Sequence, residues 1–470
     1  MAITSVALAS CAGAKKYPVA PTSDTVDFYF GEKIADPYRP LENDTAAETL
    51  AWVEQERALT EDYLSKIPFR GALRQRISDF NNYVKQGAPF LGADGRYYFF
   101  RNDGLKNQSV LYRSDKPVGG KEEVFLDPNS LSDDGTVALT GTSMSNDGRY
   151  MAYTISRSGS DWTEIYVLDT ETGRLLDDHI EWAKFTDAAW WKDGFFYSAY
   201  DRPVAGKEFS NANENHRIYY HKLGTPQSSD VLAFEDKEHP LHFHTAYVPE
   251  NERSLFVFVG GQGFGEGMMV KDLTRPDAKW VVMEPSQDYS NSVVDVIGDD
   301  VYILTSADAQ RNRLVKAPLS NPVRANWQIV VPEQEGVLTG VSRSGNDLIL
   351  TYEKDASVYP AVYSLDGNKI RDIKLPTYGT VGISSSAKSD EVFYNFASFL
   401  YPSSIYVFDK ATGESRLLTK PEIKNFNPAD YVTEQVFYTS SDGTKVPMFL
   451  TYKKGLKRDG SNPVYLYGYG

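Results

Sequence analysis

Polar turns and apolar stretches alternate in a repeating pattern from about residue 90 onward. Seven times, a turn is followed at once by a run of apolar residues; the turns are marked by Asp94, Asp147, Asp193, Asn251, Asp299, Asn346 and Asp390. Successive markers lie 53, 46, 58, 48, 47 and 44 residues apart. Turns rich in aspartate, asparagine and glycine accept positive φ and close β-hairpins, so each repeat is predicted to begin with a hairpin.

A second hairpin repeats in step with the first. Its clearest copies are the strands 165–169, 362–366 and 405–409, each followed by a polar turn, and weaker copies start at Leu111, Ile218, Met268 and Leu314. Two hairpins in about 45–50 residues make a four-stranded sheet, and such sheets arranged radially form a β-propeller. We therefore predict a mainly β protein with a seven-bladed propeller over residues 74–422; the alternative is an unrelated all-β fold.

The segments on either side of the repeat follow other patterns. Thr45 and Glu48 have capping-box spacing ahead of Leu50 and Val53, which predicts a helix over about 45–65. A second, shorter helix is predicted over about 70–82. After the repeat, a strand–turn–strand is expected over about 436–450, and 462–470 is expected to be an apolar strand ending in a Gly-Tyr-Gly turn.

Composition agrees with a β protein. Aromatic residues make up 13% of the chain, and they favour strands. The net charge of −15 argues against a nucleic-acid partner, which would require clustered Lys and Arg. No stretch approaches the roughly 20 apolar residues that span a bilayer.

Cys11 is the single cysteine, so no internal disulfide forms. It follows Leu8-Ala9-Ser10, an order similar to a bacterial lipoprotein cleavage site over a possible signal segment 1–20. The expectation is therefore a lipidated Cys11 and a periplasmic or membrane-anchored protein. The alternative is a disordered tail on a cytoplasmic protein, because no Lys or Arg precedes the apolar run.

Several motifs resemble the prolyl oligopeptidase (prolyl endopeptidase) family of serine peptidases along nearly the whole chain. The matching segments are Asp36-Pro37-Tyr38-Arg39 with Leu41-Glu42, residues 125–129 with 131–139, residues 158–162, residues 442–448, and Leu466-Tyr467-Gly468-Tyr469-Gly470. Pro40 departs from the family pattern, which usually has Trp before Leu-Glu.

The resemblance implies a propeller inserted in an α/β-hydrolase domain. Residues 21–73 and 423–470 would belong to that domain, which is incomplete here because the family's catalytic Ser, Asp and His lie beyond Gly470. The implied activity is cleavage of short peptides after proline, with the propeller gating access. We expect a monomer without cofactor or nucleic acid, inactive until the C-terminal catalytic segment is supplied. The alternatives are a non-catalytic binding propeller and a basic-specific oligopeptidase.

The same resemblance implies roles for three residues. Tyr469 would donate its hydroxyl to the oxyanion of the tetrahedral intermediate. Phe185 matches an aromatic residue that lines the family's substrate pocket, the alternative being a phenylalanine of a blade core. Phe243 aligns with another apolar pocket position. The family's pocket Arg has no counterpart in the stretch 260–265, which is Gly-Gly-Gln-Gly-Phe-Gly.

Other chemistry finds little support in the sequence. No Gly-x-Ser-x-Gly string occurs, and the nearest approach, Ser158-Gly159-Ser160, lies in a predicted hairpin. The glycines at 260–267 match neither a dinucleotide fingerprint nor a P-loop, so we predict a flexible blade loop. His239, His242 and His244 cluster in sequence, but strand periodicity places only His242 and His244 on one face, and we expect no metal site.

Overall fold

The computed structural model describes residues 16–204, 208 and 212–468. These residues form two compact units. The smaller runs up to Asp79 and includes the segment that begins at Arg202. The larger comprises Phe80–Asp201 and the chain from Asn213 onward. Among the described residues, no helix combines the length and the apolar character needed to cross a membrane.

The smaller unit contains a hairpin and the predicted helices. Its elements are β1 (Val26–Tyr29), β2 (Glu32–Ala35), the 3-10 helix η1 (Arg39–Glu42) and α1 (Ala47–Ser65), and α2 (Arg70–Asn81) ends at the boundary with the larger unit. Both predicted helices are confirmed. On α1, the apolar side chains of Leu50, Val53 and Tyr63 are about half exposed.

The predicted capping box at Thr45 is wrong. Helix α1 begins later than predicted, with Ala46 as its N-cap and no side-chain cap. The Thr45 hydroxyl instead donates to Asn43 Oδ1 at 2.9 Å, because Thr45 lies one position before the cap. Glu48 remains in the first turn, where its charge still favours the helix dipole.

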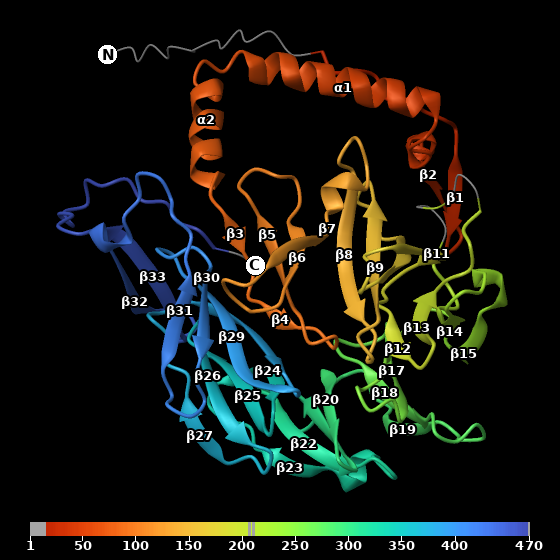
Figure 1. The fold of residues 1–470 in the computed structure, drawn as a ribbon. Coiled ribbons are helices and arrows are strands. Elements are labelled where there is room, and N and C mark those ends of the chain that lie inside the picture. The colour runs from red at the N-terminus through yellow and green to blue at the C-terminus, as the bar shows by residue number, and fades with distance from the viewer. Residues whose placement is uncertain (1–15, 205–207, 209–211, 469–470) are drawn as a thin grey trace, which may run out of the picture. The chain divides into compact units, whose positions relative to one another are not determined.

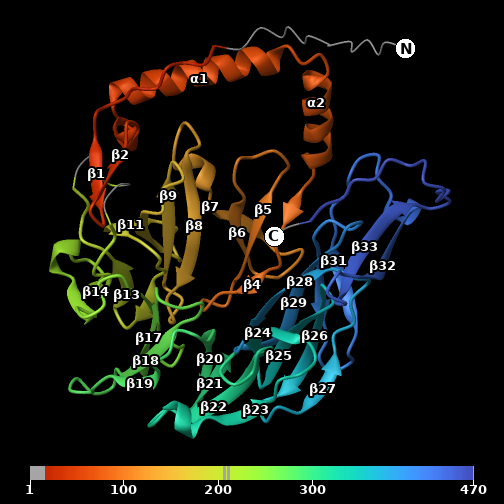
Figure 2. The same ribbon diagram turned by 180° about the vertical axis from the view of Figure 1, so that it is seen from behind.

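The larger unit contains seven consecutive groups of four antiparallel strands, which we call blades 1 to 7, followed by one further hairpin. Ala183 pairs with Ala199 and so joins blades 2 and 3 into one eight-stranded sheet. Figures 1 and 2 show the blades following one another in chain order, from orange through green to blue. Their strands are, in blade 1, β4 (Phe90–Leu91), β5 (Tyr97–Asn102), β6 (Val110–Ser114) and β7 (Glu122–Leu126), with β3 (Lys85–Gln86) added on β5; in blade 2, β8 (Val137–Met144), β9 (Tyr150–Arg157), β10 (Thr163–Asp169) and β11 (Leu175–Ala183); in blade 3, β12 (Ala189–Trp191), β13 (Gly194–Ala199), β14 (Arg217–Lys222) and β15 (Val231–Glu235).

The other four blades repeat this plan. Their strands are, in blade 4, β16 (Phe243–Tyr247), β17 (Ser254–Gly260), β18 (Gly267–Asp272) and β19 (Val281–Glu284); in blade 5, β20 (Asn291–Ile297), β21 (Asp300–Thr305), β22 (Arg313–Pro318) and β23 (Gln328–Val331); in blade 6, β24 (Val337–Ser344), β25 (Asp347–Lys354), β26 (Ser357–Ser364) and β27 (Lys369–Asp372); in blade 7, β28 (Thr380–Ser386), β29 (Ser389–Ala397), β30 (Ser404–Phe408) and β31 (Ser415–Thr419). Short 3-10 turns η2 (Pro128–Ser130), η3 (Gln227–Ser229) and η4 (Arg324–Asn326) lie between strands.

The marker residues lie at the hairpin between the first and second strands of their blades. Oxygens of Asp94, Asp147 and Asn251 each accept a hydrogen bond from the backbone N–H two residues later, at 3.0–3.1 Å. These bonds fix the turn locally, which is why the same residue type recurs. Both predicted hairpin series are therefore confirmed.

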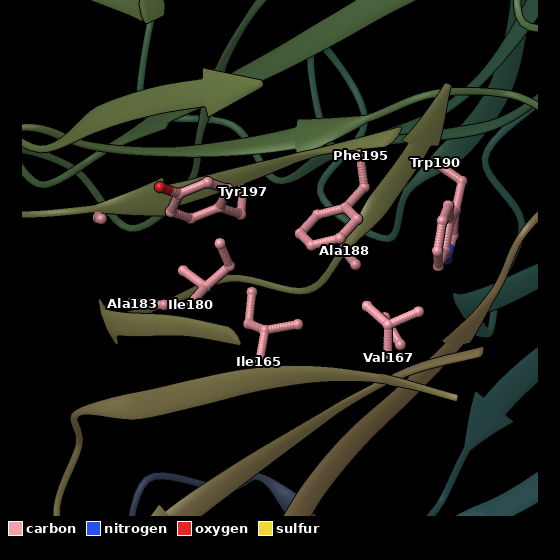
Figure 3. Close-up of a cluster of buried hydrophobic side chains, with 10 residues drawn as sticks. Ile165, Val167, Ile180, Ala183, Ala188, Trp190, Phe195 and Tyr197 are labelled. Atoms are coloured by element: carbon pink, nitrogen blue, oxygen red, sulfur yellow. The ribbon is translucent and has the colours of Figure 1, made fainter. Parts of the chain in front are cut away.

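Neighbouring blades pack through apolar side chains. Between blades 2 and 3, Ile165, Val167 and Ile180 lie on one side and Phe195 and Tyr197 on the other, as Figure 3 shows. Each of these side chains is almost completely buried. Burial of such a side chain contributes roughly 1.5–3 kcal/mol, so blade-to-blade contact is a main source of stability.

Blade 7 contacts blade 1 and closes the ring. The Ser384 hydroxyl donates to the carbonyl oxygen of Pro89 at 2.7 Å, and the Tyr97 hydroxyl donates to Glu391. Burial and the Glu391 carboxylate raise the pKa of Tyr97 to about 12, so it remains a donor. Each of the two blades takes its strands from one continuous stretch of chain, so these closing contacts are made by side chains rather than by a shared strand.

The chain after blade 7 forms one further hairpin, as predicted. It follows η5 (Pro428–Asp430) and consists of β32 (Tyr431–Thr439) and β33 (Lys445–Lys453). The predicted strand from 462 onward is wrong for the described residues: none of 462–468 belongs to a strand, and Val464 and Leu466 are 86% and 83% exposed. A strand requires a neighbour to take its hydrogen bonds, and no described strand supplies one here.

Candidate functional site

One end of the ring carries the chain connections to and from the propeller. Because each blade has four antiparallel strands in chain order, three features share this end: the start of the first strand, the loop between strands two and three, and the end of strand four. The chain enters blade 1 and leaves blade 7 here, and we call it the connection end. Residues 82–86 and 419–422 meet there around a hollow of about 410 Å³.

Phe185 and Phe243 lie together at the connection end. Phe185 belongs to the link between β11 and β12, and Phe243 is the first residue of β16. Their ring centroids are 5.9 Å apart. Phe185 is 50% exposed, so it does not belong to a blade core, while Phe243 is partly buried. The structure thus brings together two aromatic residues that are 58 positions apart in the chain.

Phe185 is held in an uncommon backbone conformation. Its φ is +52°, and Trp182 nearby has a φ of +59°. A bulky residue with positive φ costs of order 1–3 kcal/mol and persists only where surrounding contacts hold it. The strain therefore marks the 182–185 segment as one whose shape is imposed by its neighbours.

A buried lysine within this segment anchors it on one side. Lys184 is 7% exposed, and its ammonium lies 4.9 Å from the Trp162 ring and 5.3 Å from the Phe185 ring. Asp161 provides a carboxylate at 3.7 Å. Cation–π contacts of a desolvated ammonium are worth about 1–2 kcal/mol each. The connection end therefore combines exposed aromatic surface with a fixed positive charge.

Two buried histidines link the segment of Phe185 to that of Phe243. His216 Nε2 donates to the carbonyl oxygen of Lys184 at 3.0 Å, and its Nδ1 accepts from the backbone N–H of His244 at 2.8 Å. His244 Nδ1 donates to the carbonyl oxygen of His216 at 2.8 Å. Burial lowers the pKa of His216 to about 4, so it is neutral and acts as a hydrogen-bonding spacer. No sequence pattern indicated this link, since its partners are brought together only by adjacent blades.

The glycine-rich loop lies beside Phe243. Phe243 pairs with Gly260, and residues 261–266 connect β17 to β18 around a hollow of about 320 Å³ that Phe243 also lines. A Cβ on Gly263 or Gly265 would come within 2.0 or 1.9 Å of the carbonyl oxygens of Gln287 and Tyr289. The Gly265 N–H also donates to Gln287 O at 2.8 Å. Glycine is therefore required at these two positions because the neighbouring backbone approaches so closely. The prediction of a flexible loop gave no such reason for the glycines.

The remaining sequence-predicted residues fall elsewhere. Tyr469 and Cys11 lie outside the described residues. Ser158 and Gly159 form the turn between β9 and β10 with φ of +53° and +76°, as predicted for a hairpin.

The prediction for the histidines is wrong: β16 starts at Phe243, so the strand period does not reach His242, whose ring stacks on His239 instead. Asp236, His239 and His242 have side-chain oxygen and nitrogen atoms close enough to share a metal ion.

The fold and this aromatic surface define a seven-bladed β-propeller domain with its candidate site at the connection end. Residues 18–421 match the family profile described as the N-terminal β-propeller domain of prolyl oligopeptidase. The chain belongs to the prolyl oligopeptidase family.

Two curated relatives illustrate the match. The prolyl endopeptidase of Elizabethkingia meningoseptica is 43% identical over 458 residues, and the match covers 97% of this chain and 64% of that protein. A prolyl oligopeptidase of Omphalotus olearius is 32% identical over 496 residues, covering 97% of this chain and 66% of its own length. The chain therefore spans about two thirds of the length of these relatives, corresponding to their propeller-containing part.

Solved structures agree. A structure from a mechanistic study of two prolyl endopeptidases superposes with a TM-score of 0.70 at 33% identity, covering 94% of this chain and 64% of that chain. Prolyl oligopeptidase B of Galerina marginata, bound to a 35mer hydrolysis and macrocyclization substrate, gives a TM-score of 0.82 at 27% identity, covering 94% and 65%. Similarity at this level supports both the fold and the family.

Proposed function

We propose that this chain is the propeller-containing part of a serine endopeptidase that cleaves short peptides on the carboxyl side of proline. The relatives named above are prolyl endopeptidases and oligopeptidases. The observation that carries the proposal to this chain is the pairing of Phe185 with Phe243 at the connection end, from which the chain leads on to β32 and β33.

An α/β-hydrolase domain would complete the protein. Residues 21–73 and 423–470 would supply its first pieces. The exposed apolar side chains of α1 in the smaller unit, and those of Val464 and Leu466 in the larger unit, are each apolar surface that such a domain would cover. A catalytic serine, histidine and aspartate would follow Gly470. In such a triad the serine attacks the peptide carbonyl, the histidine takes its proton, and the aspartate orients the histidine.

Two groups of this chain would act on the peptide. Tyr469 would donate its hydroxyl to the oxyanion, and a donor in that role is worth roughly 3 kcal/mol in the transition state. The Phe185 ring, half exposed and held by strained backbone, offers a rigid apolar surface for a peptide that enters along the connection end. The ring of seven blades would restrict entry to short peptides, which gives selectivity by size.

The role of Phe185 can be tested in the protein made from the complete reading frame. Phe185→Ala is expected to lower kcat/KM for a proline-containing peptide by roughly 10–100-fold, since losing a well-packed aromatic contact costs about 2 kcal/mol. Val118→Ala is the control, because Val118 is 47% exposed and lies between β6 and β7 at the opposite end of the ring. Equal effects of the two substitutions on kcat/KM would remove Phe185 from the proposed function.

A further inference from the structure

The segment between β15 and β16 gathers three side chains with metal-ligating atoms. Asp236, His239 and His242 follow one another at intervals of three residues. Asp236 Oδ1 accepts the backbone N–H groups of Glu238 and His239, and the N–H of His242 donates to the carbonyl oxygen of His239 at 3.0 Å. The backbone therefore curls around the Asp236 carboxylate and leaves Oδ2 for the two imidazoles.

The ligating atoms converge on Asp236 Oδ2. His239 Nδ1 lies 2.9 Å from it and His242 Nδ1 lies 3.5 Å from it, and each of the three residues offers one ligand atom within 4.8 Å of those of the other two. His242 is only 6% exposed, and its Nδ1 is buried without a hydrogen-bond partner. A buried nitrogen without a hydrogen-bond partner lowers the stability of the fold by about 1–3 kcal/mol. A metal ion bound to His242 Nδ1 would remove this cost.

We propose that Asp236, His239 and His242 bind a divalent transition metal ion of the zinc class. Two imidazole nitrogens and one carboxylate oxygen are the donors that such ions take, whereas magnesium and calcium take oxygen alone. Three protein ligands leave a fourth position for water or an exchangeable group. The inference does not depend on the proposed peptidase activity, because metal binding is measured directly.

The ligands need only local movement to close on an ion. The rings of His239 and His242 are stacked, with centroids 4.5 Å apart and planes 8° apart, so one ring must turn for both nitrogens to point at a common centre. The His239 side chain is 48% exposed and can turn.

Gln287 connects this cluster to the glycine-rich loop. Gln287 Oε1 accepts the Gln262 N–H at 2.7 Å, so its Nε2 faces His242 Nε2 at 3.2 Å and donates to it. Because Nε2 accepts this hydrogen bond, Nδ1 is the His242 nitrogen that carries a proton. A metal ion at Nδ1 moves that proton to Nε2, where it meets an amide NH₂ group. The amide must turn and release Gln262, so metal binding would loosen the loop beside Phe243.

This geometry predicts a substitution that strengthens binding. In Gln287→Glu, one carboxylate oxygen can still accept the Gln262 N–H while the other accepts the Nε2–H of metal-bound His242. A carboxylate behind a ligating histidine fixes its orientation and raises its basicity, and such partners change metal affinity by about 10–100-fold. We therefore expect zinc to bind Gln287→Glu about tenfold more tightly than the original chain.

The test is a calorimetric titration of the untagged chain with Zn²⁺ after chelator treatment, repeated with Co²⁺ by visible absorption. We expect one ion per chain, binding weakened at least tenfold in His239→Ala, and the tightening in Gln287→Glu. His179→Ala is the control, since His179 pairs with Glu164 at 2.8 Å outside the cluster, and it should change nothing. His239 is exposed, so its loss should not unfold the chain, which circular dichroism verifies.

Three results would overturn the proposal: no binding at one ion per chain, affinity unchanged in His239→Ala, or affinity unchanged in Gln287→Glu. The last two would place any bound zinc on other residues. None of these readouts involves peptide hydrolysis, so failure of the metal site and failure of the proposed function remain separate outcomes.

Discussion

Replacing His221 with alanine is expected to lower the free energy of unfolding by about 3–5 kcal/mol. His221 is completely buried in blade 3, with Nδ1 2.8 Å from Asp230 and Nε2 3.0 Å from Asp178. Asp178 also accepts the Gly224 N–H and Asp230 accepts the Tyr197 hydroxyl. Without the imidazolium, two buried carboxylates would be left with no cation between them.

The same site predicts a pH dependence. Burial would lower the pKa of His221, but hydrogen bonds and charge from Asp230 and Asp178 outweigh it and raise the pKa above 6.5. A histidine whose pKa is higher in the folded than in the unfolded protein stabilises the folded state. This contribution is complete at pH values below the unfolded-state pKa, and it is lost as the pH rises through the folded-state pKa. Stability of the original chain should therefore fall above pH 6.5, and the fall should be shallower in His221→Ala.

Urea unfolding at a series of pH values measures both effects. The variant with His221→Ala, Asp178→Asn and Asp230→Asn removes the charges together and should recover part of the lost stability, since the penalty comes from unpaired buried charge. His179→Ala serves as a control, because His179 is partly exposed and its loss should cost under about 1 kcal/mol. Similar losses from His221→Ala and His179→Ala would contradict the buried triad.

Phe195→Ala is expected to destabilise the chain by about 3–5 kcal/mol. Phe195 is completely buried on β13, where its ring contacts those of Trp190, Tyr197 and His221 at centroid distances of 5.3, 6.2 and 5.3 Å. Removing the ring would leave a cavity between blades 2 and 3 that rigid neighbouring sheets cannot fill. Thermal or urea unfolding of the single variant measures the loss.

Phe185→Ala is the matched comparison. Phe185 lies ten residues earlier and is 50% exposed, so its truncation should cost less than about 1 kcal/mol. The two substitutions compare a buried phenylalanine with an exposed one, both at the boundary between blades 2 and 3. A loss for Phe185→Ala as large as that for Phe195→Ala would mean that Phe185 is a packing residue and would weaken the proposed function.

The blades were predictable because their signals are local. Asp94, Asp147 and Asn251 each accept a hydrogen bond from the backbone N–H two residues later. A few consecutive residues therefore determine each turn, and the same residue types recur in the sequence. The predicted capping box failed by a single position: Ala46 is the N-cap, and Asn43 takes the Thr45 hydroxyl. Helix boundaries depend on such competing local bonds, which spacing alone does not rank.

The candidate site was less predictable because its contacts cross blades. Resemblance identified Phe185 and Phe243, but only burial separates a surface phenylalanine from a core one. The bonds that join His216 to Lys184 and to His244 span 32 and 28 residues, and Gln287 meets His242 across 45 residues. Sequence spacing does not predict which residues meet across blades. Strand periodicity was wrong for His242 because β16 begins one residue later, at Phe243.

The proposal that this chain is the substrate-admitting part of a peptidase is tested most directly by activity. A fluorogenic proline amide should be hydrolysed by the protein made from the complete reading frame, with inhibition by a serine-reactive phosphonate. The 470-residue chain alone should show no turnover and no labelling by that reagent, since it contains no Gly-x-Ser-x-Gly string to present a nucleophile. Turnover or serine labelling by the 470-residue chain, or no turnover by the complete product, would contradict the account.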